Sequence, residues 1–431
     1  MGVSQPVLGS APTPAPPGGL GHSLRYPGFR NLFSSSAAST FGFAVSIVAV
    51  SWIVYHYTHS ALDVAYLGLA EIGPGILLGL AAGVVADRYN RRSLMVTADL
   101  TRMAGMAILA ASLYFLGFSL LLILAVMVVI ESFSALFTPA SQAILPHLVE
   151  SSSLEDANGL LYSSSGVARS IGSATGGIVV AILGAVWGIG INAVTYGLSA
   201  VFILQIGSKL GQVAAQPPTR RTSFTADFSE GMRYVLGSRT LTELSFGYLP
   251  SNFLSSFVSP FFVVYASARF GGSPLAFGYL AAALAIGTAA GGLAVGRLPT
   301  RRRAGWWLGG TVLLEGVVYG VLAFAMNLDL AVLAAFGAGI TIGFGNTVYY
   351  SVMQASVPSR VLGRVLSIID FGSFVAIPAG LVVGGLLISK YGVGPTIAVA
   401  ALGIFLTGVV LLSLRDFRAF GARNPPYDQV S

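Results

Sequence analysis

The sequence contains no cysteine and few charged residues. Without cysteine, the chain of 431 residues can form no disulfide bond or zinc–thiolate site and has no cysteine nucleophile. The remaining soft metal ligands are four histidines (His22, His56, His59 and His147), so we expect no metal site and no cofactor. Charged residues make up 9% of the chain, against about 25% in an ordinary soluble domain. This shortage excludes a soluble enzyme.

The local patterns of common catalytic sites are also absent. No segment carries His-Glu-x-x-His, Gly-x-Ser-x-Gly, Gly-x-Gly-x-x-Gly or the phosphate-binding loop Gly-x-x-x-x-Gly-Lys. An enzyme within the membrane is therefore unsupported. The lack of a nucleotide-binding loop favours secondary transport over transport driven by ATP.

Apolar residues are abundant, at 55% of the chain. A helix needs about 20 apolar-rich residues to cross a bilayer, and no segment has the alternating pattern of a barrel strand. The sequence therefore predicts an all-α integral membrane protein with twelve spans. We expect them at 29–57, 62–86, 93–115, 119–142, 157–183, 186–206, 239–267, 274–297, 305–326, 329–355, 361–388 and 394–414.

The basic residues indicate how these spans are oriented. An even number of spans places both termini on one side, and nineteen of the 23 Arg and Lys residues lie in segments on that side. The opposite side holds Arg269 and Lys390, while Arg102 and Arg169 lie inside spans. Because basic loops stay in the cytoplasm, we expect a cell-membrane protein with both termini cytoplasmic. The net charge of +7 then requires no nucleic-acid partner.

The spans divide into two sets of six. We expect a disordered tail at 1–28, a first bundle at 29–206, a cytoplasmic linker with an amphipathic helix at 207–238, a second bundle at 239–414, and a cytoplasmic tail at 415–431. The run QAILP at 142–146 ends span four, and QASVP at 354–358 ends span ten. This repetition indicates duplicated halves, which in transporters place the substrate path between them.

The loop after span two carries the strongest local motif. Residues 83–92 read GVVADRYNRR, which resembles the pattern Gly-x-x-x-Asp-Arg-x-Gly-Arg-Arg of the major facilitator superfamily. The matching residues are Gly83, Asp87, Arg88, Arg91 and Arg92, whereas Asn90 replaces a glycine in a turn that asparagine also tolerates. The resemblance covers nearly the whole chain and implies a twelve-helix transporter. We expect this loop to act in the conformational cycle, with its arginines anchored to anionic headgroups.

Span five carries a second motif, GVARSIGSATGG at 166–177. It is similar to the glycine-rich antiporter motif Gly-x-x-x-Gly-Pro-x-x-Gly-Gly of exporters, with Ser173 in place of proline. We expect its glycines to allow close helix packing, across the interface of the halves or as general small-residue packing. These glycines are Gly166, Gly172, Gly176 and Gly177. Together with the runs near 139–146, 157–160 and 228–235, the motif resembles the branch of macrolide-efflux and enterobactin-exporter proteins.

Ionisable residues inside spans are costly and are therefore functional candidates. The candidates for binding a proton or the substrate are Glu71, Glu131, Arg169 and Asp370. Glu131 and Arg169 lie near mid-depth of consecutive spans, and we expect them to interact. Asp99 and Arg102 have the spacing of an ion pair within one helix, which favours a structural role. Glu315 is less attractive, because span nine is peripheral in the superfamily's arrangement.

The sequence thus predicts a monomeric secondary transporter that exports a small amphipathic molecule, a drug, siderophore or related metabolite, by proton antiport with alternating access. Glu71 and Asp370 have no basic residue within one turn, so each can hold a proton near neutral pH or a hydrogen bond to a neighbour. The alternatives are movement of lysophospholipid or another amphiphile between leaflets, and a membrane receptor or scaffold that transports nothing. Carboxylates in both halves count against the receptor.

Overall fold

The computed structural model describes residues 21–207, 224–296, 298, 303–357 and 359–420. Within these ranges the regular structure is helical, with no strand. The long helices of the first half are α1 (Pro27–Thr58), α2 (Ala61–Arg88), α3 (Arg91–Phe115), α4 (Leu120–Ile144), α5 (Leu154–Ile182) and α6 (Ala185–Leu204). The rest of the described chain forms α7 (Phe224–Gly237), α8 (Arg239–Ser255), α9 (Phe262–Arg269), α10 (Pro274–Val295), α11 (Ala304–Phe324), α12 (Leu328–Ser356), α13 (Ser359–Tyr391), α14 (Val393–Ser413) and α15 (Arg415–Arg418). Short 3-10 turns are η1 (His22–Arg25), η2 (Leu145–His147), η3 (Ser151–Ser153) and η5 (Ser259–Phe261).

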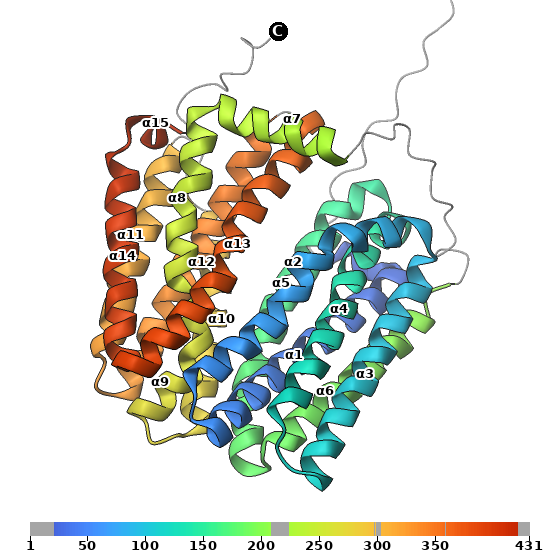
Figure 1. The fold of residues 1–431 in the computed structure, drawn as a ribbon. Helices are drawn as coiled ribbons and strands as arrows, with labels where there is room; N and C mark the ends of the chain where they lie inside the picture. The colour runs from blue at the N-terminus through green and yellow to red at the C-terminus, as the bar shows by residue number, and fades with distance from the viewer. Residues whose placement is uncertain (1–20, 208–223, 297, 299–302, 358, 421–431) are drawn as a thin grey trace, which may run out of the picture.

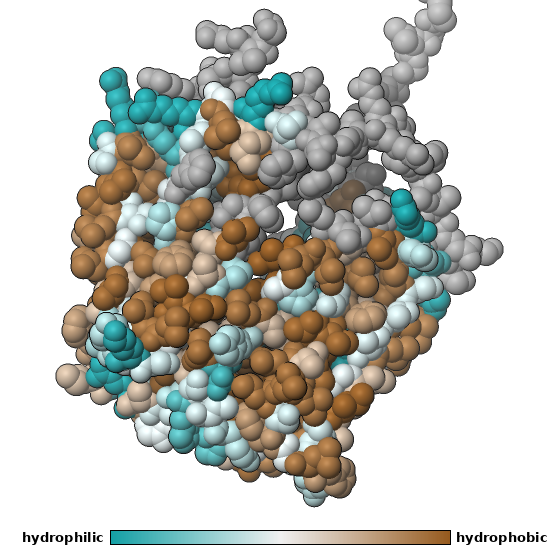
Figure 2. All heavy atoms as spheres, in the orientation of Figure 1, coloured by the Kyte–Doolittle hydropathy of each residue, from teal (hydrophilic) through white to brown (hydrophobic). Residues whose placement is uncertain are grey.

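The helices are long enough to cross a bilayer. Eleven segments of the described chain combine sufficient length with sufficient apolar content, and a shorter apolar stretch, Val375–Tyr391, ends α13. Figure 2 shows a broad hydrophobic band across the middle of the molecule, with hydrophilic residues gathered near both ends of the face shown. The all-α membrane fold expected from the sequence is therefore confirmed.

Two groups of helices make up the molecule (Figure 1). In the first, α1 packs against α5 and α6, and α2 packs against α4; in the second, α10 packs against α12, and α11 against α14. The groups meet through α5 with α10 and through α2 with α13. Figure 1 shows them close together at the end that carries α9 and apart at the end that carries α7.

The seventh predicted span is not one continuous helix. The helix α8 ends at Ser255, the turn η5 follows, and α9 continues to Arg269. Pro260 lies inside this turn, where its missing N–H group prevents the helical hydrogen-bond ladder from continuing. The interruption places Ser259 and Pro260 in the wall of a cavity described below.

Side-chain caps define where several helices begin. The Asn90 carboxamide oxygen accepts a hydrogen bond from the Ser93 backbone N–H at 3.0 Å, with Asn90 at φ −59°. Asn90 therefore serves as the N-cap of α3, and the turn does not need the left-handed backbone that glycine would allow. The Asn327 side chain caps α12 in the same way, accepting from the Leu330 N–H at 2.8 Å.

The last long helix of each group begins after a glycine of unusual backbone conformation. Gly184 precedes α6 with φ 93° and ψ 164°, and Gly392 precedes α14 with φ 86° and ψ 165°. A side chain rarely tolerates this conformation, so each turn requires glycine. The same backbone conformation therefore precedes α6 in the first group and α14 in the second.

Candidate functional site

A cavity of about 700 Å³ lies between the two groups of helices. The first group contributes residues of α1, α2 and α5 to its wall, and the second contributes residues of η5, α9, α10 and α12. Its lining is mainly apolar or small, and the charged residues among the lining are Glu71 and Arg169. A cavity of this kind accommodates a small molecule that is largely apolar and carries a polar or charged group.

Glu71 and Arg169 reach this cavity from different helices. Glu71 projects from α2, and Arg169 projects from α5, where its side chain is exposed to the cavity. Because α2 packs against α4, Glu71 also lies close enough to Glu131 of α4 for the two carboxylates to interact electrostatically. The carboxylate at the cavity wall therefore has a second carboxylate behind it.

Glu131 faces Arg102 and not Arg169. Arg102 of α3 is the basic group that interacts with the Glu131 carboxylate, whose Oε1 atom is buried without a hydrogen-bond partner. No ion pair joins Glu131 to Arg169 among the residues that the structure describes. The expected pair is thus absent, because α4 and α5 are consecutive in sequence but do not pack against each other: α4 packs against α2 and α3, whereas α5 packs against α1 and α10.

Arg102 is held in place by a buried polar network. Its guanidinium forms an ion pair with the Asp99 carboxylate, as the sequence predicted. The Ser199 hydroxyl donates to the other oxygen of Asp99 at 2.6 Å, and Asp99 is fully buried. The guanidinium carbon lies 4.5 Å from the ring centroid of Phe137 and 4.6 Å from that of Tyr196. This support fixes a positive charge behind Glu131.

Two arginines of the loop motif form hydrogen bonds with the ends of neighbouring helices. Arg91 donates to the Ala143 carbonyl at 2.9 Å near the end of α4, and Arg92 donates to the Leu204 carbonyl at 2.5 Å at the end of α6. Helix C-termini carry partial negative charge, which favours arginine there. These two arginines therefore bind protein carbonyls, where we expected lipid headgroups.

The other motif residues lie at the end of α2. The side chain of Arg88 is exposed. Gly83 and Asp87 belong to α2, but their surroundings lie outside what the structure describes. The same holds for the side chain of Asp370 in α13.

The glycine-rich motif of α5 meets two different helices. A Cβ atom added to Gly172 would lie 2.5 Å from the Phe41 carbonyl oxygen of α1, and one added to Gly176 would lie 2.9 Å from the Val45 carbonyl oxygen. Facing the second group, a Cβ on Gly177 would lie 2.8 Å from the Gly278 Cα of α10. Gly166 also faces α10, at an ordinary packing distance. The motif thus packs α5 against its own group and against the other.

Glu315 of α11 is buried within the second group of helices. Its side chain is 8% exposed and accepts a hydrogen bond from the Ser255 hydroxyl at 2.8 Å. The helix α11 therefore directs this carboxylate into the second group of helices. The signal available in the sequence was a lone acid within a 21-residue apolar helix.

Metal binding finds no support in the described residues, which include no cluster of three His, Asp or Glu side chains suited to a metal ion.

Comparisons with known proteins place this architecture among transporters. The chain is 28% identical to the multidrug efflux pump Tap of Mycobacterium tuberculosis, covering 92% of this chain and 95% of Tap. It is 22% identical to macrolide efflux protein A of Streptococcus pyogenes, covering 90% of this chain and 96% of that protein. These relatives are transporters and not enzymes.

Solved structures show the same fold. The nucleoside transporter NupG superposes with a TM-score of 0.73 at 10% identity, covering 90% of this chain and 98% of NupG. A bacterial homologue of the human lysosomal transporter Spinster, in an inward-facing and occupied conformation, gives a TM-score of 0.64 at 19% identity, covering 94% and 98% of the two chains. The family model described as transmembrane secretion effector matches residues 22–425. The chain therefore belongs to this family of multi-pass membrane transporters, within the major facilitator superfamily.

Proposed function

We propose that this transporter exports a small amphipathic molecule from the cytoplasm in exchange for protons. The observation that carries the proposal is the cavity of about 700 Å³, which both groups of helices line and which combines an apolar wall with Glu71 and Arg169. The efflux activities named for Tap and macrolide efflux protein A point in the same direction. The arginine-rich loops and the linker helix α7 then lie on the cytoplasmic face of the cell membrane. The chain carries out this cycle as a monomer.

The way in which the two groups meet supports a cycle of alternating access. The contacts of α5 with α10 and of α2 with α13 close one end, while the groups are apart at the α7 end (Figure 1). Rocking about these contacts would close the α7 end and open the other. The motif residues Gly83, Asp87, Arg88, Arg91 and Arg92 would regulate this movement at the cytoplasmic face, with Arg91 and Arg92 holding α3 to the ends of α4 and α6.

Glu71 is our candidate for the group that exchanges a proton for substrate. A carboxylate in a poorly solvated cavity binds a proton readily, and a second carboxylate nearby strengthens that tendency. Glu131 supplies the second carboxylate, and Arg102 interacts with Glu131 from the neighbouring helix α3. Substrate and proton would then compete at Glu71, and an inward proton gradient would drive the substrate out. Asp370 is a second candidate, in the other half.

The experiment uses the full chain in proteoliposomes with ethidium, a fluorescent amphipathic cation. An imposed pH gradient is expected to drive ethidium movement, and Glu71→Gln is expected to abolish the response while slow downhill movement persists. Asp63→Asn is the matched control, because Asp63 lies on the same helix outside the cavity lining. Asp370→Asn tests the second candidate.

The results of this experiment would distinguish proton antiport from lipid movement and from a receptor role. Ethidium movement that ignores both the pH gradient and these substitutions would exclude proton antiport. The same liposomes with a fluorescent lysophospholipid would then test movement of an amphiphile between leaflets. Binding without movement of either compound would indicate a receptor.

A further inference from the structure

A second pocket lies within the C-terminal group of helices, apart from the central cavity. It has a volume of about 250 Å³ and is lined from α8, α11, α12 and α13. Its lining shares no residue with that of the central cavity. The function proposed above makes no use of this pocket.

The chemistry of the lining is that of a site for an organic cation. Glu315 is the charged residue of this lining, and Asn252 and Asn346 add amide groups. Two tyrosines on different helices, Tyr248 and Tyr349, present rings with centroids 6.2 Å apart at an interplanar angle of 52°. A carboxylate beside aromatic faces is the combination that binds ammonium groups, because both the charge and the ring quadrupoles attract a cation.

The carboxylate is positioned for such a ligand. The Ser255 hydroxyl donates to Oε1 of Glu315 at 2.8 Å, which orients the side chain from the opposite helix α8. Within the described residues Glu315 has no ion-pair partner. An ionised carboxylate at 8% exposure is costly without a counter-charge. A bound cation would supply it.

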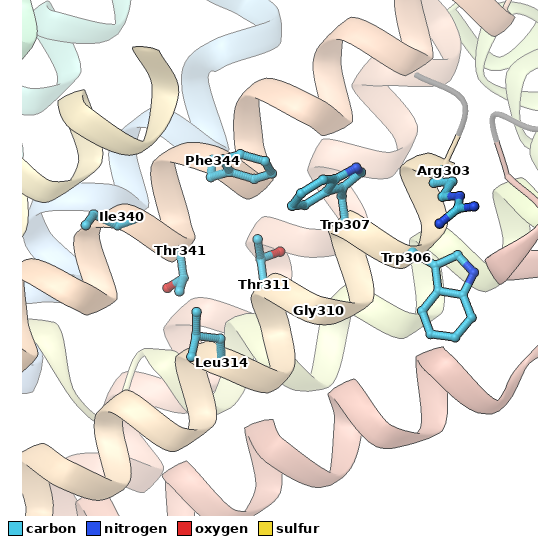
Figure 3. Close-up of a pocket in the computed structure, with 9 residues that line it drawn as sticks. All are labelled: Arg303, Trp306, Trp307, Gly310, Thr311, Leu314, Ile340, Thr341 and Phe344. Atoms are coloured by element: carbon cyan, nitrogen blue, oxygen red, sulfur yellow. The ribbon is translucent and has the colours of Figure 1, made fainter. Parts of the chain in front are cut away.

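A groove lined by residues of α11 and α12, drawn in Figure 3, adjoins this pocket. The groove has a volume of about 510 Å³, and Thr311 and Thr341 belong to the linings of both the groove and the pocket. Figure 3 shows these threonines between α11 and α12, with Trp307 and Phe344 beside them. Trp306 at the groove is half exposed and Leu314 nearly so, as expected of a wall that faces lipid.

The basic end of the groove does not oppose this route. Arg303 lies at the rim, twelve residues before Glu315, which corresponds to about 18 Å along a helix. At that separation Arg303 does not form an ion pair with Glu315. The two threonines, and not the arginine, separate the groove from the pocket.

The geometry points to a site for an organic ammonium ion at Glu315, reached from the bilayer through the groove between α11 and α12. The inference rests on the proposed function for its substrate class, because it makes this pocket a cation subsite of the exporter. It differs from that function in placing the ligand within one half and not between the halves.

The binding test uses the full chain in phosphatidylcholine nanodiscs and benzyltrimethylammonium, with neopentylbenzene as its neutral isostere. We expect wild type to bind the cation and not the isostere, and Glu315→Gln to weaken binding about tenfold or more. Asp329→Asn, which removes an exposed acid of α12 outside the pocket, is the control. Equal affinity of Glu315→Gln and wild type, or equal binding of the isostere, would overturn the inference.

A measurement on wild type makes the test independent of variant folding. Dicyclohexylcarbodiimide modifies buried carboxyls, and benzyltrimethylammonium is expected to protect Glu315 from it in peptide mass spectrometry. Protection of Glu71 alone would place the cation in the central cavity, which overturns this inference but supports the proposed function. Protection of Glu315 in a protein that shows no proton-driven transport would refute the proposed function only.

The route is tested with two glycines of α11. A Cβ atom at Gly310 or at Gly320 meets no atom within 4 Å, and Gly310 lines the groove whereas Gly320 does not. Gly310→Phe is expected to slow association of the cation severalfold at unchanged affinity, while Gly320→Phe leaves the rate as in wild type. Equal association rates in both variants would show that the ligand does not arrive through the groove.

Discussion

A side chain at Gly177 should prevent the closed end of the transporter from forming. A Cβ atom there would lie 2.8 Å from the Gly278 Cα and 3.0 Å from the Pro274 carbonyl oxygen. Carbon atoms pack at about 3.5 to 4.0 Å, so α5 and α10 would have to separate by roughly 1 Å. Both obstructing atoms belong to the backbone and cannot rotate away.

The size of the effect follows from the cost of overpacking. Added methyl groups in a packed interface cost about 1 to 3 kcal/mol, which shifts a two-state equilibrium roughly 5- to 150-fold. We therefore expect Gly177→Val to depopulate the conformation seen here by a factor in that range. The transporter would then open at the end where α5 now contacts α10.

The assay takes advantage of the absence of cysteine. Ser51→Cys introduces a single thiol at a buried position of the central cavity wall, and a membrane-impermeant maleimide is added on the side away from the arginine-rich loops. Labelling is expected to be slow with Gly177 present and at least fivefold faster with Gly177→Val. Gly190→Val is the control, because a Cβ atom at Gly190 meets no neighbour. If labelling rates are the same in all three proteins, the contact of α5 with α10 does not close this end.

Three further substitutions test the polar interior and the loop motif. Asp99→Ala should lower the free energy of unfolding by about 3 to 5 kcal/mol, because Arg102 would stay buried without its partner. Chemical denaturation in micelles measures this change, and a decrease below about 1 kcal/mol, as expected of a surface substitution, would contradict the prediction. A double-mutant cycle on transport should give non-additive effects for Glu131 with Arg102 and additive effects for Glu131 with Arg169, and the reverse pattern would mean that α4 and α5 approach during the cycle. Asp87→Asn should leave membrane insertion intact and impair ethidium efflux at matched expression, whereas unimpaired efflux would remove the functional role of the loop.

Local features of the chain were predictable from the sequence, and long-range ones were not. Helix location depends on runs of apolar residues, and the pair of Asp99 with Arg102 depends on a three-residue spacing, so both could be found by inspection. The supposed pair of Glu131 with Arg169 was wrong, because adjacency along the chain does not give adjacency in a bundle. The Glu315 carboxylate accepts a hydrogen bond from Ser255, sixty residues earlier, and no local sequence pattern predicts such a contact.

The loop arginines illustrate the same distinction. Their number and position predicted a basic face, which is a local property of the sequence. Their partners, the terminal carbonyls of α4 and α6, are brought to Arg91 and Arg92 only by the folded bundle. A sequence motif therefore located the residues without revealing what they bind.

The two strained glycine turns allow the same experiment to be done in each half of the molecule. A Cβ atom at Gly184 or at Gly392 would meet no neighbour, so alanine at either position would add backbone strain alone, of about 1 to 3 kcal/mol. The same local defect can thus be placed in either half of one polypeptide. Comparing which helices lose hydrogen-exchange protection in each case would measure how far a disturbance travels, and hence whether the halves fold as separate cooperative units or as one.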